Sequence, residues 1–135
     1  MTLGSLAQAC SGGGPTSPSA RSVPLLAGAT ATLVNGAVTL TIDAASPLSA
    51  VGGAALVQSP LGTLLVVRTA QGSFAALTAI CTHEACTITG FDGSVFVCPC
   101  HGSEYNTSGR VLSGPAPSSL RQFTTQFAGN VLTIS

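Results

Sequence analysis

Charged side chains are scarce in this sequence of 135 residues. Only 6% of the residues are Asp, Glu, Lys or Arg, whereas ~25% is usual for soluble domains. The four acidic and four basic residues cancel, so the formal net charge at pH 7 is zero. This balance excludes nucleic-acid binding through a basic face. Intrinsic disorder is also excluded, because it requires high charge and low hydropathy, and 45% of this chain is hydrophobic.

Long hydrophobic runs are lacking as well. No apolar stretch reaches the ~18 residues of a transmembrane helix, and residues 1–9 are too short and polar for the apolar part of a secretory signal. Cys10 with its neighbours loosely resembles the end of a bacterial lipoprotein signal, which predicts a lipid anchor at Cys10. The alternatives are an unmodified linker cysteine and a disulfide to another chain.

A protein surface with so few charged side chains must interact with water or with a partner in some other way. Either uncharged polar side chains solvate it, or a partner in a larger assembly buries much of it. Residues 1–20 are rich in Gly, Ser and Pro, so we expect this N-terminal segment to be flexible or bound to a partner.

Strand-forming residues and turn signals fill residues 21–135. The chain has 16 Gly and 8 Pro, and no segment favours a helix of more than a turn or two. Asn-Gly at 35–36 and Asp-Gly at 92–93 predict two-residue hairpin turns. Strands at a spacing of about ten residues predict an all-β antiparallel sandwich or barrel. The expected strands are 31–34, 37–42, 54–58, 63–69, 73–80, 87–90, 94–98, 110–113, 120–127 and 131–134.

Several other features carry no chemistry in the sequence. The four arginines are scattered, and we expect them to be solvated. No Ser–His–Asp arrangement is available, because both histidines lie beside cysteines. No glycine loop of the phosphate-binding kind is present. The arginines are Arg21, Arg68, Arg110 and Arg121.

Both histidines belong to two cysteine-rich segments. The first reads Cys-Thr-His-Glu-Ala-Cys at 81–86, and the second reads Cys-Pro-Cys-His-Gly-Ser-Glu-Tyr at 98–105. The spacings Cys-x-His and Cys-x-x-His, with a hairpin between them, predict a two-loop metal site in which each loop supplies a thiolate and an imidazole. Tetrahedral zinc also suits two Cys and two His. A further alternative is a pair of disulfides with incidental histidines.

The two segments resemble the Rieske iron–sulfur family. The additional cysteine in each segment is similar to the form found in Rieske subunits of quinol-oxidising cytochrome complexes, and residues 114–117 resemble that family's proline loop. The resemblance implies a [2Fe–2S] cluster with Cys81 and Cys98 on one iron and His83 and His101 on the other.

Further implications of the resemblance concern the surroundings of the cluster. A disulfide would join Cys86 to Cys100, and a small cluster-binding subdomain at about residues 80–115 would be inserted in a Rieske domain of residues 21–135. Ser103 matches the serine that donates to a bridging sulfide, and Tyr105 matches the tyrosine that donates to a ligand cysteine. Such hydrogen bonds stabilise the reduced state, so we expect a potential in the upper part of the Rieske range of ~−150 to +300 mV.

The function implied is one-electron transfer by a subunit that turns over no substrate of its own. The implied partners are a quinol-oxidising complex and a protein with a c-type haem, and the disulfide implies an oxidising compartment outside the cytoplasm. The alternatives are an extracellular carrier without its own substrate, whether soluble, lipid-anchored or assembled, and the ferredoxin of a Rieske oxygenase system.

The chain departs from the quinol-oxidising members at two positions. They carry Leu and Gly where this sequence has Glu84 and Ala85. An exposed carboxylate at Glu84 would be merely solvated, would stabilise protonated imidazoles, or would face a basic partner.

Overall fold

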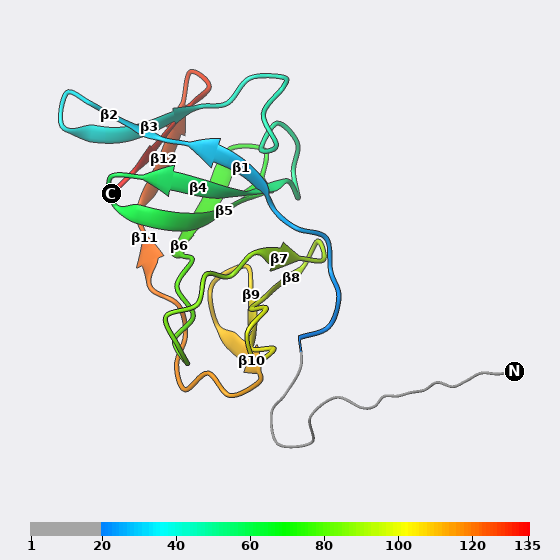
Figure 1. Cartoon of the computed structure of the whole chain (residues 1–135). Coiled ribbons are helices and arrows are strands. Elements are labelled where there is room, and N and C mark those ends of the chain that lie inside the picture. Colours follow the sequence, from blue (N-terminus) through cyan, green and yellow to red (C-terminus); the bar gives the residue numbers. More distant parts are fainter. Residues whose placement is uncertain (1–19) are drawn as a thin grey trace, which may run out of the picture.

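The computed structural model describes residues 20–135, which form three β-sheets and no α-helix (Figure 1). Within these residues, nothing helical has the length and hydropathy needed to cross a membrane. The prediction of an all-β fold with mostly antiparallel pairing is confirmed, and the one parallel pair among the paired strands is β1 with β4. Cys10 and the rest of residues 1–19 lie outside the described residues, so the lipid anchor stays a prediction.

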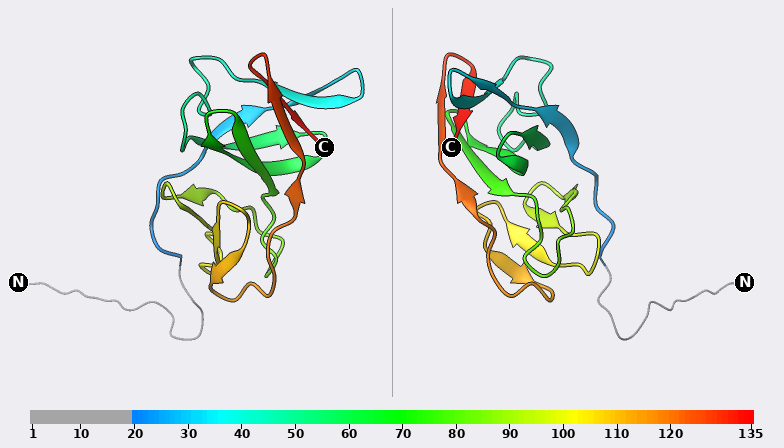
Figure 2. Two further views of the ribbon diagram at one scale, coloured as in Figure 1. Left: turned by 180° about the vertical axis from the view of Figure 1, so that it is seen from behind. Right: turned by 60° about the vertical axis from the view of Figure 1, so that its left-hand side comes forward.

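Two of the sheets pack face to face as a sandwich (Figures 1 and 2). Side chains from both sheets, such as Val66 and Leu132, belong to one buried cluster. The first sheet has the order β1 (Ala27–Thr30), β4 (Ala54–Ser59), β5 (Gly62–Ala70), β6 (Ser73–Thr78) and β11 (Gln122–Phe123). The second has the order β12 (Thr125–Ala128), β13 (Val131–Ile134), β3 (Ala37–Thr41) and β2 (Thr32–Val34).

The third sheet lies beside one end of the sandwich, below it in Figure 1. The chain enters this sheet after β6 and leaves it before β11, and these two strands pair with each other in the first sheet. The third sheet and its loops, which we call the lower module, are thus an insertion between neighbouring sandwich strands. Its order is β10 (Val111–Ser113), β9 (Glu104–Asn106), β8 (Val95–Val97) and β7 (Gly90–Phe91).

Strand β5 connects the sandwich to the lower module, because both of its faces are buried. Leu64 and Val66 pack in the sandwich core. Leu65 and Val67 point the other way and pack in a second core, which continues to Phe96. This core also reaches the two cysteine-rich segments at 81–86 and 98–105, which we call the ligand loops. Alternate residues of a strand face opposite sides, so the unbroken apolar run at 64–67 serves two cores. The ligand loops therefore rest on a rigid, doubly buried strand.

The predicted hairpin at 31–42 is confirmed. Asn35 and Gly36 have φ of 51° and 81°, which is the left-handed pair that a type I′ turn requires. Gly129 and Asn130, at 57° and 63°, make the same turn between β12 and β13.

Other expectations about the strands were wrong. The single strand expected at 120–127 is two strands, β11 and β12, which belong to different sheets. Strands β1 and β9 were not predicted. The four residues of β1 are all small, and only one of them is half-buried, so the apolar pattern is weak. Strand β9 begins at the end of the second cysteine-rich segment, and the motif of that segment does not indicate that the chain there pairs with another strand.

The expectation that Arg68 is solvated was also wrong. Its side chain is buried, with 6% of the residue exposed. The guanidinium donates hydrogen bonds to the backbone carbonyls of Leu48, Ser49 and Gln71, and two phenylalanine rings lie within 5.2 Å of it. Arg68 therefore ties the loop before β4 to the sandwich, and the polar atoms of that loop replace the water that the charge has lost.

Candidate metal centre

Backbone hydrogen bonds close both cysteine-rich segments into loops. The first loop follows β6, and the N–H of Cys81 donates to the carbonyl of Cys86 at 2.9 Å. The second loop connects β8 to β9, and the N–H of Cys98 donates to the carbonyl of Ser103 at 2.9 Å. Gly102 has a φ of 79°, which L-residues with a side chain rarely adopt. Each loop thereby holds its cysteine and histidine at fixed places.

A disulfide joins the two loops. Cys86 and Cys100 are bonded, with their Cα atoms 6.5 Å apart. Cys81 and Cys98 are free and buried, with 5% and 1% of each residue exposed. The pairing implied by the resemblance is present, and the alternative of two disulfides is wrong.

The two imidazoles lie together at the open end of the loops. The ring centroids of His83 and His101 are 4.9 Å apart, and 32% and 30% of their side-chain surfaces are exposed. The Nδ1 atom of His101 is nevertheless buried, and no partner in residues 20–135 meets it with hydrogen-bond geometry. A buried nitrogen of this kind fits a metal ligand.

Glu84 reaches the same nitrogen atoms. Its Oε2 lies 2.8 Å from Nδ1 of His101 and 3.7 Å from Nδ1 of His83. The first distance is that of an ion pair, although its direction does not make a hydrogen bond. The carboxylate therefore lies against the Nδ1 side of both imidazoles, while 52% of its side-chain surface is exposed, and it is not only a solvated side chain.

The donor atoms separate by chemistry. Among the described residues, one close group is Cys98 with the two cysteines of the disulfide, Cys86 and Cys100, and the other is the two imidazoles with Glu84. Each group lies within 4.8 Å, and neither mixes sulfur with imidazole nitrogen. A single zinc ion needs all four ligands within about 2.3 Å of itself, which this separation disfavours. The arrangement suits two ions, one on the buried sulfur side and one on the exposed nitrogen side.

The hydroxyl of Tyr105 organises the sulfur side. It lies 3.2 Å from Sγ of Cys81 and accepts a hydrogen bond from the backbone N–H of Thr82 at 3.3 Å. Thr82 Oγ1, 3.2 Å from the phenol, donates its own proton to the carbonyl of Ser118 at 2.6 Å. A charged thiolate is the stronger acceptor for the phenol proton, so the geometry directs that proton toward Cys81.

The two candidate thiols are not equivalent. Burial alone would raise the pKa of Cys81, but hydrogen bonds from Tyr105 and from the backbone N–H groups of His83 and Glu84 outweigh burial and lower that pKa. Burial and the neighbouring Cys81 raise the pKa of Cys98. Burial also raises the pKa of Tyr105, which keeps its phenol a donor. Cys81 is thus the first to become a thiolate, the form that binds metal.

A third loop, residues 114–118, supports both ligand loops. The N–H of Ala116 donates to Oγ of Ser103 at 3.1 Å, and the hydroxyl proton of Ser103 keeps no acceptor among residues 20–135. Ser103 is buried, so that proton is available to a group bound between the loops. Gly114 lies so close that an added Cβ would be 2.5 Å from Cα of Ser103.

Residues 114–117 were predicted to form a loop of this kind, whereas Thr82 and its bond to Ser118 were not predicted. No local signal could have found this contact, since its partners are 36 residues apart. All six predicted site residues lie at this centre. They are Cys81, His83, Cys98, His101, Ser103 and Tyr105.

Comparisons with known proteins agree with this geometry. A family model described as the Rieske [2Fe-2S] domain matches residues 42–124. The cytochrome b6-f complex iron-sulfur subunit of Prochlorococcus marinus strain MIT 9303 is 49% identical over 74 residues, which cover 51% of this chain and 41% of that protein. The subunit of the same name from Chlorobaculum thiosulfatiphilum is 35% identical over 72 residues, which cover 53% and 40%. The chain thus spans about two fifths of the length of these curated relatives.

Solved structures show the same likeness. The plasma membrane Rieske protein PetC3 from Synechocystis PCC 6803 has a TM-score of 0.56 and 35% identity, covering 62% of this chain and 86% of that one. A complex of reduced oxygenase and oxidized ferredoxin in carbazole 1,9a-dioxygenase has a TM-score of 0.56 and 27% identity, covering 72% and 92%. Because the family model spans both ligand loops and more than half of the sequence, this chain belongs to the Rieske [2Fe-2S] domain family.

Proposed function

We propose that this chain transfers single electrons through a [2Fe–2S] cluster held by Cys81 and Cys98 on one iron and by His83 and His101 on the other. The observation that carries the proposal is the separation of donors, with two buried thiols on one side and two partly exposed imidazoles on the other. When bound, the cluster supplies a one-electron acceptor, and neutral imidazoles in place of two thiolates make its reduction easier.

The chain's own residues would bind, shield and tune this group. The lower module is, in this proposal, the cluster-binding subdomain expected at about residues 80–115. The buried cysteines exclude water from the sulfur side, and the disulfide keeps the loops from separating. The hydroxyl of Tyr105 lies 3.2 Å from Sγ of Cys81, and within the part of the chain that the structure describes, the hydroxyl of Ser103, which accepts from Ala116, has its own proton free to donate. Both hydroxyls would favour the reduced state by donating to sulfur atoms of the cluster.

The exposed edge of the two imidazoles is the proposed route of the electron. Because Nδ1 of His101 is buried while 30% of the side chain is exposed, the accessible part of that ring is its outer edge. A redox partner would dock there and would also meet the side chain of Glu84, which is 52% exposed beside the rings. A carboxylate at this place favours a partner surface that carries positive charge.

We also propose that the chain works within a larger quinol-oxidising assembly outside the cytoplasm, with a c-type haem as electron acceptor. The names of the relatives as subunits of the cytochrome b6-f complex support this, and the disulfide supports an oxidising compartment. The ferredoxin of an oxygenase system is the second candidate, because a structure containing such a ferredoxin shares the fold.

Redox titration monitored by electron paramagnetic resonance tests the proposal. Natively purified protein should contain iron and acid-labile sulfide in equal amounts and give a resonance of low average g when reduced. The variant His101→Ala should lose this signal, whereas Arg110→Gln, an exposed change, should keep it. Zinc in place of iron, with no resonance, would refute the cluster.

The same titration separates the two candidate roles. A potential near the upper end of the Rieske range of ~−150 to +300 mV supports the quinol-oxidising assembly, and one near the lower end supports the ferredoxin.

A further inference from the structure

The chain that precedes β1 runs along the lower module before it enters the sandwich (Figure 1). The N–H of Leu26 donates to the carbonyl of Thr89 at 2.8 Å, and the N–H of Phe91 donates to the carbonyl of Pro24 at 3.0 Å. Leu25 forms an antiparallel bridge with Gly90. Residues 20–26, which we call the strap, thus cover the outer edge of β7. Without the strap, this two-residue strand would end the sheet with open backbone groups.

Side-chain packing also holds the strap against the module. A Cβ built on Gly90 would lie 2.4 Å from Cγ2 of Val23, so only glycine admits the strap at this distance. Leu26 packs against the second core, which also contains Cys81 and Tyr105. The strap therefore packs as part of the lower module, which bears the ligand loops. It also connects directly to β1 of the sandwich.

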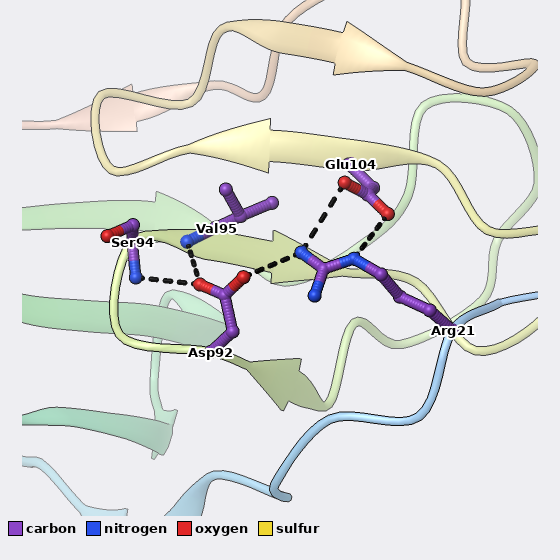
Figure 3. Close-up of polar contacts among 5 residues, drawn as sticks. All are labelled: Arg21, Asp92, Ser94, Val95 and Glu104. Carbon is purple, nitrogen blue, oxygen red and sulfur yellow. Dashed lines mark hydrogen bonds and ion pairs between the residues drawn. The ribbon is translucent and has the colours of Figure 1, made fainter.

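Arg21 extends the hold of the strap to the middle of the sheet (Figure 3). Its Nη2 lies 2.7 Å from Oδ2 of Asp92, and its Nε lies 2.8 Å from Oε2 of Glu104. Asp92 belongs to the turn between β7 and β8, and Glu104 belongs to β9. One guanidinium thereby joins three segments that are remote in sequence.

The carboxylate of Asp92 is ionised and held in one orientation in its contact with Arg21. The hydrogen bond from Arg21 and those from the N–H groups of Ser94 and Val95 hold its pKa at about 2. Both bonds from the turn are 2.8 Å long. The group is therefore charged at any physiological pH, and the turn fixes its direction.

Glu104 relates Arg21 to the cluster site, because it stands between Ser103 and Tyr105. Successive side chains of a strand face opposite sides, so Glu104 faces Arg21 while its two neighbours are buried, at 1% and 0% exposed. The hydroxyl of Tyr105 lies 3.2 Å from Sγ of Cys81. Contacts that hold Glu104 in place therefore also hold the start of β9, with the buried hydroxyl group of Ser103 on one side and that of Tyr105, which contacts Cys81, on the other.

We propose that Arg21 is a positioning residue for the cluster site, and that it holds β9 in place from the strap. The redox consequence rests on the proposed function, whereas the mechanical link does not. Loss of the guanidinium would leave Asp92 and Glu104 as two carboxylates without their shared cation. Their repulsion would loosen the strap and β9, and the hydrogen bonds of Ser103 and Tyr105 would lengthen.

The test compares Arg21→Gln with Arg110→Gln in the full chain. Both substitutions remove one positive charge next to the lower module, but the Arg110 side chain makes no ion pair among residues 20–135. Arg21→Gln should lower the reduction potential more than Arg110→Gln does and should broaden the resonance of the reduced protein. Arg21→Lys, which keeps the charge but not the two-sided contact, should fall between Arg21→Gln and the unmodified protein.

Amide hydrogen exchange provides a readout that does not depend on the cluster. In Arg21→Gln, the amides of Leu26 and Phe91 should exchange about threefold to fivefold faster, as loss of a surface ion pair allows. The amide of Val66 in the sandwich core should keep its rate. Equal potentials for the two glutamine variants, or unchanged exchange at Leu26 and Phe91, would overturn the proposal.

The two proposals can fail separately. If the purified chain holds no iron, the proposed function fails, and the exchange rates of the amides of Cys98 and Tyr105 decide this inference in place of the potential. Faster exchange at both amides in Arg21→Gln, and not in Arg110→Gln, supports positioning of β9. Unchanged exchange there refutes it.

Discussion

At the scale of single residues, Tyr105 serves the core and the site at once. Its ring is fully buried in the second core, while its hydroxyl contacts Sγ of Cys81. A buried phenol needs a hydrogen-bond partner, and the partners here are Sγ of Cys81, a candidate cluster ligand, and the N–H of the next residue, Thr82. We therefore expect stability and redox chemistry to depend on the same side chain.

This dual role leads to a prediction about the potential. The double substitution Ser103→Ala, Tyr105→Phe should lower the reduction potential by about 40 mV per hydrogen bond, because ~1 kcal/mol per bond corresponds to that shift for one electron. Protein-film voltammetry would measure it, with Tyr105→Phe alone giving the share of the phenol. An unchanged potential would mean that neither hydroxyl reaches the cluster.

At the scale of elements, the third loop holds the two ligand loops together. Gly114 has a φ of 91°, and a Cβ added to it would lie 2.5 Å from Cα of Ser103. We predict that Gly114→Ala destabilises the fold by about 1–3 kcal/mol and shortens the lifetime of the bound cluster. Gly93→Ala is the matched control, because Gly93 also has a positive φ, 102°, but open space around it.

Urea unfolding and the decay of the visible absorbance would measure both effects of Gly114→Ala. The strain of a positive φ is common to the two variants, so the excess in Gly114→Ala reports the contact with Ser103. Equal decay in the two variants would show that the third loop does not support the ligand loops.

The disulfide between the ligand loops gives a second prediction at this scale. The bond closes a segment with a separation of 14 residues, and a loop of that length is worth about 3 kcal/mol in the chain-entropy account. Removing the bond in the double variant Cys86→Ser, Cys100→Ser should lower the unfolding free energy by that order and speed the loss of the cluster in air. A cluster equally long-lived in both proteins would contradict this role.

At the scale of the whole molecule, two cores share one strand. Strand β5 gives Leu64 and Val66 to the sandwich and Leu65 and Val67 to the lower module. Because the side chains of β5 divide between the two cores, we expect a change confined to one core to leave the packing of the other core intact. Arg68, on the sandwich side, is the most informative residue for this separation.

We predict that Arg68→Met lowers stability without changing the potential. The variant leaves the carbonyls of Leu48, Ser49 and Gln71 without their donor, at a cost of about 3 kcal/mol. Thermal unfolding would show the loss, and Arg121→Met serves as control because the side chain of Arg121 lies at the surface over Phe123. A shift of the potential as large as that of Tyr105→Phe would show that the two cores are not independent.

The ligand loops could be predicted because their information is local. The types and spacing of cysteine and histidine within 81–105 already specify two loops with mixed donors. Three other features depended on distant parts of the chain. Thr82 bonds to Ser118, Arg21 pairs with Glu104, and the predicted strand at 120–127 divides where it leaves one sheet for another. Hydrophobic periodicity indicates which face of a segment is buried, but it does not indicate which other segment packs against that face.

The residue order by itself determined the candidate donors of this protein, its two-residue turns and its β character, because each follows from neighbours within a few positions. The tertiary structure alone decided that β5 serves two cores, that Arg21 pairs with Glu104 and that Arg68 is buried. These outcomes depend on which segments pack against one another in the folded chain. Burial and charge pairing are set by both packed surfaces, so no single segment determines them.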